Sequence, residues 1–227
     1  MTKARMALLI SVLVTGLLYV VPFGSWLAWP LILISTVAHE SGHGLMAIVV
    51  GGDFQSLKIH GDASGVARWS GEVGRFGQAA VSAGGLLGPA FTAAALFGTA
   101  RTPKAAQWAL GLLGLALVLL TVFFVRNLFG FVFVGLLAAL ALGIARFTRP
   151  ETSQLALVFT AVQLSLSVFS RADYLFTPTA HTASGVMPSD VASIADALLL
   201  PYWVWGLACG GLSLLVLGIG LANFLRR

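Results

Sequence analysis

Charged side chains are scarce in this chain. Lys, Arg, Asp and Glu make up 9% of its 227 residues, whereas an average soluble domain carries about 25%. Hydrophobic residues make up 58% of the chain. So little charge is not compatible with the surface of an ordinary soluble domain, and the composition predicts an integral membrane protein.

Cysteine and clustered basic residues are lacking as well. Cys209 is the single cysteine, which excludes an intramolecular disulfide and a thiolate metal cluster. The net charge is +5, but the basic residues lie at the ends of apolar segments, as Lys3 and Arg5 do before the first one. That pattern is typical of anchoring at lipid headgroups, so we expect the bilayer, and not nucleic acid, as the partner of these charges.

The apolar runs predict the architecture. No A-x-A-like cleavage site follows the first run, so we expect a retained helix and not a signal peptide. Each run is close to the ~20 residues that cross a bilayer, although one of the two that flank Arg126-Asn127 could be re-entrant. We therefore predict an all-α polytopic membrane protein, a single domain over residues 1–227 with six or seven transmembrane helices. The expected spans are residues 6–22, 26–50, 77–98, 106–125, 128–147, 153–172 and 201–224.

One of these spans contains a run of ionisable residues. It reads His39-Glu40-Ser41-Gly42-His43, and ionisable groups at this depth cost several kcal/mol each unless a partner compensates them. Residues four apart share a helix face, so His39 and His43 can bind one ion in the manner of the H-E-x-x-H zinc motif. Glu40 then lies beside the metal, where it can take a proton from a metal-activated water and return it to a leaving amine.

The segment from Gly51 to Arg75 interrupts the apolar pattern. Alternating residues on both sides of Gly61-Asp62 predict a small β-hairpin directly after the span that carries the motif. The free edge of such a hairpin could pair with an extended substrate by strand addition. A second interruption, residues 177–200, places Ser189 as the N-cap of a short helix that begins at Asp190.

A third metal ligand is needed, because catalytic zinc usually has three protein ligands and an open position. Asp173 and Asp190 are both carboxylates near the ends of apolar runs. Asp173 could equally be a paired interfacial charge, and Asp190 a capping acid in a first helical turn. His60 and His181 have a suitable side chain but no supporting spacing. The residues alone leave these alternatives open.

Several motifs together resemble the site-2-protease clan of intramembrane zinc metalloproteases, and more closely a short bacterial branch without a PDZ domain. The resemblance implies that Asp190 is the third ligand, although no Leu precedes it and Val191 stands where the clan's L-D-G motif has Gly. The segments that carry the resemblance are His39–Gly44 with Gly51-Gly52, Leu57–Gly65, Ala83–Gly85 with Gly88-Pro89, Arg126–Gly130, and Ser189-Asp190 with Ala192 and Pro201.

The resemblance implies a zinc endopeptidase with one Zn²⁺ per chain and a membrane-protein substrate. A non-proteolytic zinc protein, either a pseudoprotease or a metal carrier, is the alternative, but its site would not need a base such as Glu40. Asn127 either contacts the substrate carbonyl or oxyanion or merely separates two spans.

We expect the protein in a bacterial inner membrane, with the site nearer the cytoplasmic side. If Lys3 and Arg5 are cytoplasmic, the first span runs outward and the second span returns inward. Lys58, Arg68 and Arg75 then lie on the cytoplasmic side together with the motif.

Overall fold

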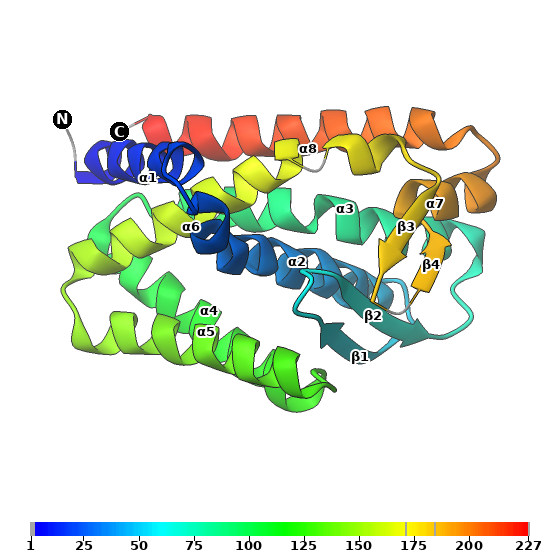
Figure 1. Ribbon diagram of the computed structural model, residues 1–227, viewed down its shortest axis with the longest axis horizontal. Coiled ribbons are helices and arrows are strands. Elements are labelled where there is room, and N and C mark those ends of the chain that lie inside the picture. The colour runs from blue at the N-terminus through cyan, green and yellow to red at the C-terminus, as the bar shows by residue number, and fades with distance from the viewer. Residues whose placement is uncertain (1–2, 171, 184, 227) are drawn as a thin grey trace.

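The protein is a bundle of long apolar helices with two small β-hairpins at one end (Figure 1). The computed structural model describes residues 3–170, 172–183 and 185–226. Within these residues six helices, α2 to α6 and α8, are long and apolar enough to cross a membrane, while α1 has a shorter apolar stretch. The expected all-α polytopic fold is confirmed. The helices are α1 (Lys3–Val20), α2 (Gly24–Val49), α3 (Gly74–Thr99), α4 (Pro103–Phe123), α5 (Leu128–Phe147), α6 (Pro150–Ser170), the 3₁₀ helix η1 (Ala172–Phe176), α7 (Asp190–Leu198) and α8 (Tyr202–Leu225).

Helix α3 forms the centre of the bundle, where it packs against α2, α6, α7 and α8. Its contact with α2 depends on glycine. A Cβ atom on Gly42 would lie 2.2 Å from the carbonyl oxygen of Gly84, and a Cβ on Gly84 would lie 2.7 Å from the carbonyl oxygen of Gly42. Only residues without side chains allow two helix backbones to approach this closely. The motif helix is therefore held directly against α3.

The first hairpin follows the motif helix, as expected. It consists of β1 (Asp53–Ile59) and β2 (Gly65–Ser70), which pair antiparallel with a bulge between Phe54 and Ser56. The apolar side chains of β1 face inward, since Phe54, Leu57 and Ile59 join a buried cluster with residues of α2 and α5. The polar face of the hairpin is left for the site and for solvent.

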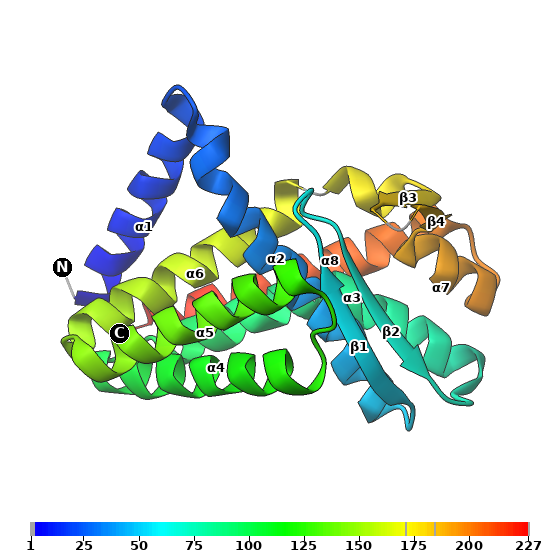
Figure 2. The same ribbon diagram turned by 60° about the horizontal axis from the view of Figure 1, so that its bottom comes forward.

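The outer edge of β1 is occupied by the connection between α4 and α5 (Figure 2). The N–H of Leu57 donates to the carbonyl of Phe124 at 2.8 Å, and the N–H of Arg126 donates to the carbonyl of Leu57 at 2.9 Å. One residue further on, Asn127 makes two hydrogen bonds to the backbone of Ile59. The sequence analysis treated these residues as a short break between two spans, but they make a parallel β-bridge to the edge of β1.

A second hairpin, which the sequence analysis did not predict, lies in the interval 177–200. Its strands are β3 (Thr179–Thr182) and β4 (Gly185–Pro188). Figure 1 shows it at the right-hand end with α7, next to the first hairpin. The expected short helix after it is confirmed: α7 begins at Asp190, and the Ser189 hydroxyl caps it by accepting from the N–H of Ala192 at 3.2 Å.

The N-terminus and the C-terminal end of α8 lie together at the other end of the bundle (Figure 1). Arg5 donates to the carbonyl of Leu225 there, at 3.0 Å. α1 and α2 together carry the chain from this end of the bundle to the hairpin end. The expected membrane orientation of the N-terminal charges and the hairpin stays a prediction.

Candidate metal centre

The two histidines of the motif lie on one face of α2, as the spacing predicts. Nε2 of His39 is 3.2 Å from Nε2 of His43, and the two rings meet edge to face. Nδ1 of His43 lies 2.8 Å from the carbonyl oxygen of Val81 on α3. Since a carbonyl can only accept, Nδ1 carries a proton, which leaves Nε2, the nitrogen that faces His39, as the one that can bind a metal.

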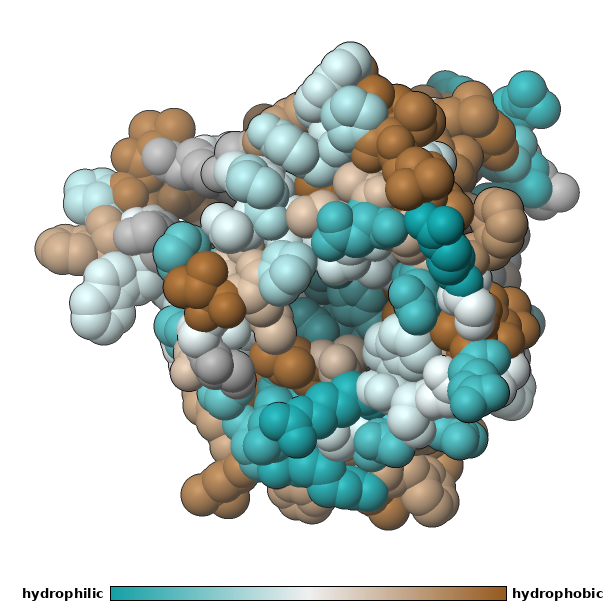
Figure 3. All heavy atoms as spheres, turned by 90° about the vertical axis from the view of Figure 1, so that its right-hand side faces the viewer, coloured by the Kyte–Doolittle hydropathy of each residue, from teal (hydrophilic) through white to brown (hydrophobic). Residues whose placement is uncertain are grey.

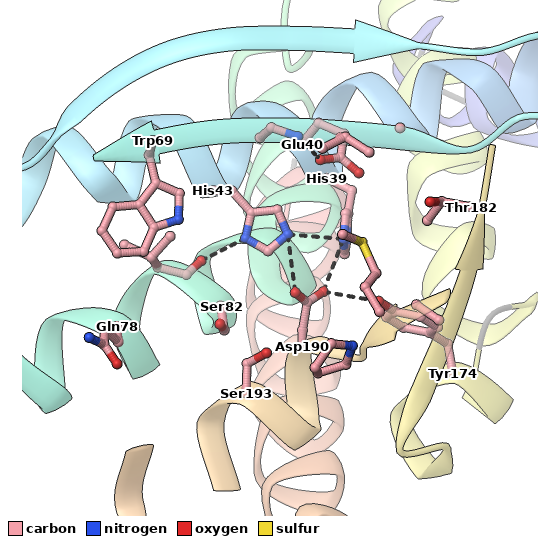
Figure 4. Close-up of a pocket in the computed structure, with 17 residues that line it drawn as sticks. His39, Glu40, His43, Trp69, Gln78, Ser82, Tyr174, Thr182, Asp190 and Ser193 are labelled. Atoms are coloured by element: carbon pink, nitrogen blue, oxygen red, sulfur yellow. Dashed lines mark hydrogen bonds and ion pairs between the residues drawn. The ribbon is translucent and has the colours of Figure 1, made fainter. Parts of the chain in front are cut away.

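Asp190 approaches the two histidines from the start of α7. Its Oδ2 lies 3.1 Å from Nε2 of His39 and its Oδ1 lies 3.3 Å from Nε2 of His43. The preceding residue, Ser189, fixes this position, because its hydroxyl donates to the carbonyl of Thr177 and its N–H donates to the carbonyl of Pro178. His39 and Asp190, which are 151 positions apart in the sequence, therefore meet at one point together with His43 (Figure 4).

The charge state of Asp190 suits a cation. Burial alone would raise the pKa of its carboxyl, but the attraction to His43 and hydrogen bonds from His39 and His43 outweigh burial and hold this pKa below its usual range. The group is therefore a carboxylate at neutral pH, which is the form that binds metal ions.

The donor set fits a metal ion. One ligand atom from each of His39, His43 and Asp190 can be chosen so that all lie within 4.8 Å of one another. Two imidazole nitrogens and one carboxylate oxygen are a combination typical of catalytic zinc, which keeps a fourth position open for water or substrate. Among the residues that the structure describes, this is the group with suitable donors, and the three side chains all border one cavity.

Glu40 lies beside this group and is held by β2. The residue is buried, and its Oε2 accepts a hydrogen bond from the N–H of Ala67 at 2.7 Å. The pairing of β1 explains this contact: Leu57 points its N–H and carbonyl toward the α4–α5 connection, so its cross-strand partner Ala67 points the same groups the other way. The free edge of β2 therefore faces the cavity, and one N–H along this edge, that of Ala67, already donates to Glu40.

The cavity has a volume of about 420 Å³ and opens at the end of the bundle that carries both hairpins. Figure 3 shows this face as a hollow with hydrophilic residues on its floor and along much of its rim. Its lining comes from α2, β2, α3, η1, both strands of the second hairpin, and α7. The cavity is thus polar and accessible from the hairpin end.

The other residues singled out from the sequence are placed elsewhere. The side chain of Asp173 lies outside those that the structure describes. His60 lies in the turn of the first hairpin and His181 on β3, and neither borders the cavity. The amide of Asn127 does not border it either: Nδ2 donates to the carbonyl of Ile59 at 2.6 Å and Oδ1 accepts from its N–H at 3.1 Å. The structure thus gives Asn127 a place in the sheet.

Several cavity residues were missed by the sequence analysis. The Tyr174 hydroxyl lies 3.5 Å from Oδ2 of Asp190, and its ring meets that of His39 edge to face. Trp69, Gln78 and Ser82 border the opposite side of the cavity. One signal could have found two of them, since Gln78 and Ser82 are polar residues four apart on one face of an otherwise apolar span.

Comparison with known proteins gives one result. A family model described as Peptidase M50B-like matches residues 8–220. No curated protein and no solved structure matches the chain. The matched range contains the motif, both hairpins and the start of α7, so every residue of the candidate metal centre lies inside it.

Proposed function

This chain belongs to the Peptidase M50B-like family, and we propose that it is an intramembrane zinc endopeptidase. Its substrate would be a transmembrane or membrane-associated protein segment. The observation that carries the proposal is the convergence of His39, His43 and Asp190 within 4.8 Å, with the carboxylate of Glu40 beside them. A structural zinc site needs no adjacent base, whereas hydrolysis of a peptide bond does.

Each residue has a role that follows from its contacts. His39, His43 and Asp190 would hold the metal, which when bound supplies a Lewis acid that lowers the pKa of a coordinated water. Glu40 would accept a proton from the attacking water and deliver it to the leaving amine. The hydrogen bond from the N–H of Ala67 to Glu40 orients this carboxylate in the free enzyme.

The free edge of β2 gives the substrate a place to bind. A peptide bond inside a helix is shielded from attack, so a transmembrane helix must unwind locally before it can be cut. Unwinding leaves backbone N–H and C=O groups without partners, which is costly in a membrane. Strand addition along β2 at Gly65 and at the carbonyl of Ala67, whose N–H already donates to Glu40, would pair some of those groups and carry the extended segment past Glu40.

We further propose a bacterial inner membrane as the location, with the site nearer the cytoplasmic side. Lys58, Arg68 and Arg75 flank the hairpin end, which the positive-inside rule favours as the cytoplasmic one, whereas Arg5 lies at the opposite end beside Leu225.

The decisive experiment measures zinc in protein purified in detergent. We expect about one zinc per chain in the wild type, its loss in His39→Ala and Asp190→Ala, and its retention in Asp173→Ala, because three protein ligands complete a catalytic site. Glu40→Gln should keep the zinc and lose about 10²- to 10⁴-fold in cleavage of transmembrane peptides, the usual contribution of a general base.

Two results would overturn the proposal in different ways. A wild-type protein that binds no zinc, even after reconstitution, would remove the metal centre altogether. A wild-type protein that holds zinc as predicted but cleaves no membrane segment would favour the non-proteolytic alternative, a pseudoprotease or a metal carrier. Loss of zinc in Asp173→Ala and not in Asp190→Ala would identify Asp173, and not Asp190, as the third ligand.

A further inference from the structure

The residues that border the cavity lie on both sides of the group formed by His39, His43 and Asp190, and we call the space on each side an arm (Figure 4). One arm is bordered by η1 and the second hairpin, through residues such as Tyr174 and Thr182. The opposite arm, which we call the neutral arm, is bordered by Trp69 of β2 and by Gln78 and Ser82 of α3.

The hydrogen-bonding groups of the two arms differ in whether they already have partners within the protein. In the first arm, the Thr182 hydroxyl donates to the carbonyl of Gly185 at 3.1 Å and the Tyr174 hydroxyl lies against Asp190. In the neutral arm, the indole N–H of Trp69, the amide of Gln78 and the hydroxyl of Ser82 have no partner among the side chains and backbone groups that the structure describes. The neutral arm therefore presents free donors and acceptors to whatever enters it.

The neutral arm also lacks charge. The ionisable residues that border the cavity are His39, Glu40, His43, Tyr174 and Asp190, and all five belong to the metal centre or to the first arm. A charged substrate side chain in the neutral arm would lose water without gaining a counter-ion, which is strongly unfavourable. An apolar one would leave the Trp69 N–H and the Ser82 hydroxyl, which are both half-buried, without partners, while the exposed Gln78 at the rim would keep its water.

The arm is directly connected to the reacting atoms. Ser82 follows Val81, whose carbonyl accepts from His43, and β2 runs from Gly65 and Ala67, beside Glu40, to Trp69 at the neutral arm. A segment added along the edge of β2 would extend from Glu40 toward this arm. A side chain close to the scissile bond would then enter it.

We propose that the neutral arm is a specificity subsite for an uncharged hydrogen-bonding side chain of the substrate, best a carboxamide (Asn or Gln), close to the scissile bond. A carboxamide offers an acceptor to the Trp69 N–H and donors to Gln78 and Ser82, which matches the groups present. Asn also weakens the helix around it, because its side chain competes for backbone hydrogen bonds. This inference rests on the proposed function.

The test measures binding, so that it does not depend on cleavage. The protein is the Glu40→Gln variant, purified with zinc, and the probes are fluorescent transmembrane peptides that differ at one central residue: Asn, Leu, Asp or Lys. We expect the Asn peptide to bind about tenfold more tightly than the Leu peptide, the effect of one or two neutral hydrogen bonds, and the charged peptides to bind most weakly.

Substitutions at Gln78 then assign the effect. Gln78→Leu should remove the preference for Asn over Leu, and Gln78→Glu should shift the preference to the Lys peptide, which a merely structural role of Gln78 would not do. Gln55→Leu is the matched control, because Gln55 bonds to Ser70 and does not border the cavity. It should keep the preference for Asn.

Equal or absent binding of the Asn and Leu peptides, or an Asn preference that survives Gln78→Leu, would overturn the subsite. Failure of the proposed function has a different signature. In that case the zinc-loaded protein with Glu40 intact would still prefer the Asn peptide but would leave it uncut.

Discussion

The two hairpins border the same cavity, but they are held in different ways. The first has an occupied outer edge, since β1 pairs with the α4–α5 connection, and its apolar face joins a buried cluster. The second has exposed residues along all of β4, and the N–H of Ala183 beside it donates to the Ser64 hydroxyl of the first hairpin at 3.1 Å. Both supply cavity residues.

The difference shows how the site is divided between rigid and adaptable parts. The first hairpin positions Glu40 and presents the strand edge, tasks that need accurate placement. The second contributes Ala180, Thr182, Met187 and Pro188 to the wall of the cavity, where small movements leave Glu40 and the histidines in place. Few buried contacts and exposed backbone are typical of segments that open locally. We therefore expect changes to the first hairpin to affect catalysis more than comparable changes to the second.

The largest effect is expected from adding one methyl group at Gly65. A Cβ there would lie 2.5 Å from Cγ of Glu40 and 2.8 Å from Cγ2 of Thr36, so Glu40 must move away. Gly65→Ala should lower cleavage about 100-fold or more, as loss of a positioned general base does. Zinc content should stay unchanged, because His39 and His43 keep their contacts. Cleavage and zinc are measured on the same preparation.

The matched change in the second hairpin is Gly185→Ala. Nothing lies within 4 Å of a Cβ at Gly185, but its φ of +116° is strained for alanine. The substitution should distort β4 and leave cleavage within about threefold, since its cost is local strain on the order of 1 kcal/mol. If Gly185→Ala impaired cleavage as strongly as Gly65→Ala, the division between the hairpins would be wrong.

A smaller effect is expected from Asn127→Ala, which frees part of the β1 edge. Ile59 is fully buried, and without the amide its N–H and carbonyl lose these partners. An unpaired buried group costs about 1–3 kcal/mol, so the free energy of unfolding should fall by this order. Cleavage should drop about tenfold as the sheet beneath Glu40 loosens, in line with the effect of small misplacements on catalysis. Denaturation and cleavage assays measure the two quantities.

Gln107→Ala is the control for that variant. The side-chain amide of Gln107 also donates to a backbone carbonyl, that of Ala145, at 2.8 Å. It joins α4 to α5 and does not border the cavity. It should lower stability but not cleavage. Equal cleavage losses in both variants would mean that Asn127 acts through overall stability and not through the first hairpin.

Local sequence signals were sufficient for the parts of the site that depend on one element. Residue spacing placed His39 and His43 on one face of a helix, and a capping residue marked the start of α7 at Asp190, as observed. Alternation and a turn signal predicted the first hairpin. Hydropathy predicted the spans, although the apolar part of α1 is shorter than the others.

Long-range pairing explains what sequence reasoning could not find. Asn127 and Ile59 are 68 residues apart, and nothing in either segment indicates the other, so the strand-like role of the α4–α5 connection was missed. The second hairpin was missed for a different reason. Its strands have only four residues each, β4 is exposed throughout and ends in Pro188, and Ala180 is the one buried residue of β3, which is too little to show an alternating pattern in the sequence.

The smallest effect is expected at the contact between the hairpins. The side-chain and backbone hydrogen bonds from Ser64 hold the pKa of Asp62 below the usual value for an aspartate. A carboxyl whose pKa is depressed by folding stabilises the folded state above the unfolded pKa, and this contribution is lost as the pH falls through the folded pKa. Ser64→Ala removes the side-chain donor, and also the acceptor for Ala183. The pKa of Asp62, measured by carboxyl NMR, should rise toward the usual value for an aspartate.

Cleavage by Ser64→Ala should stay within about twofold, since a single exposed hydrogen bond contributes little. Ser70→Ala, which loses only a contact with Gln55 on the same sheet, should leave the pKa of Asp62 unchanged. A tenfold loss of cleavage in Ser64→Ala would show that the link to Ala183 matters for catalysis. The second hairpin would then help to position Glu40 as the first one does, and the contrast between the two hairpins would have to be abandoned.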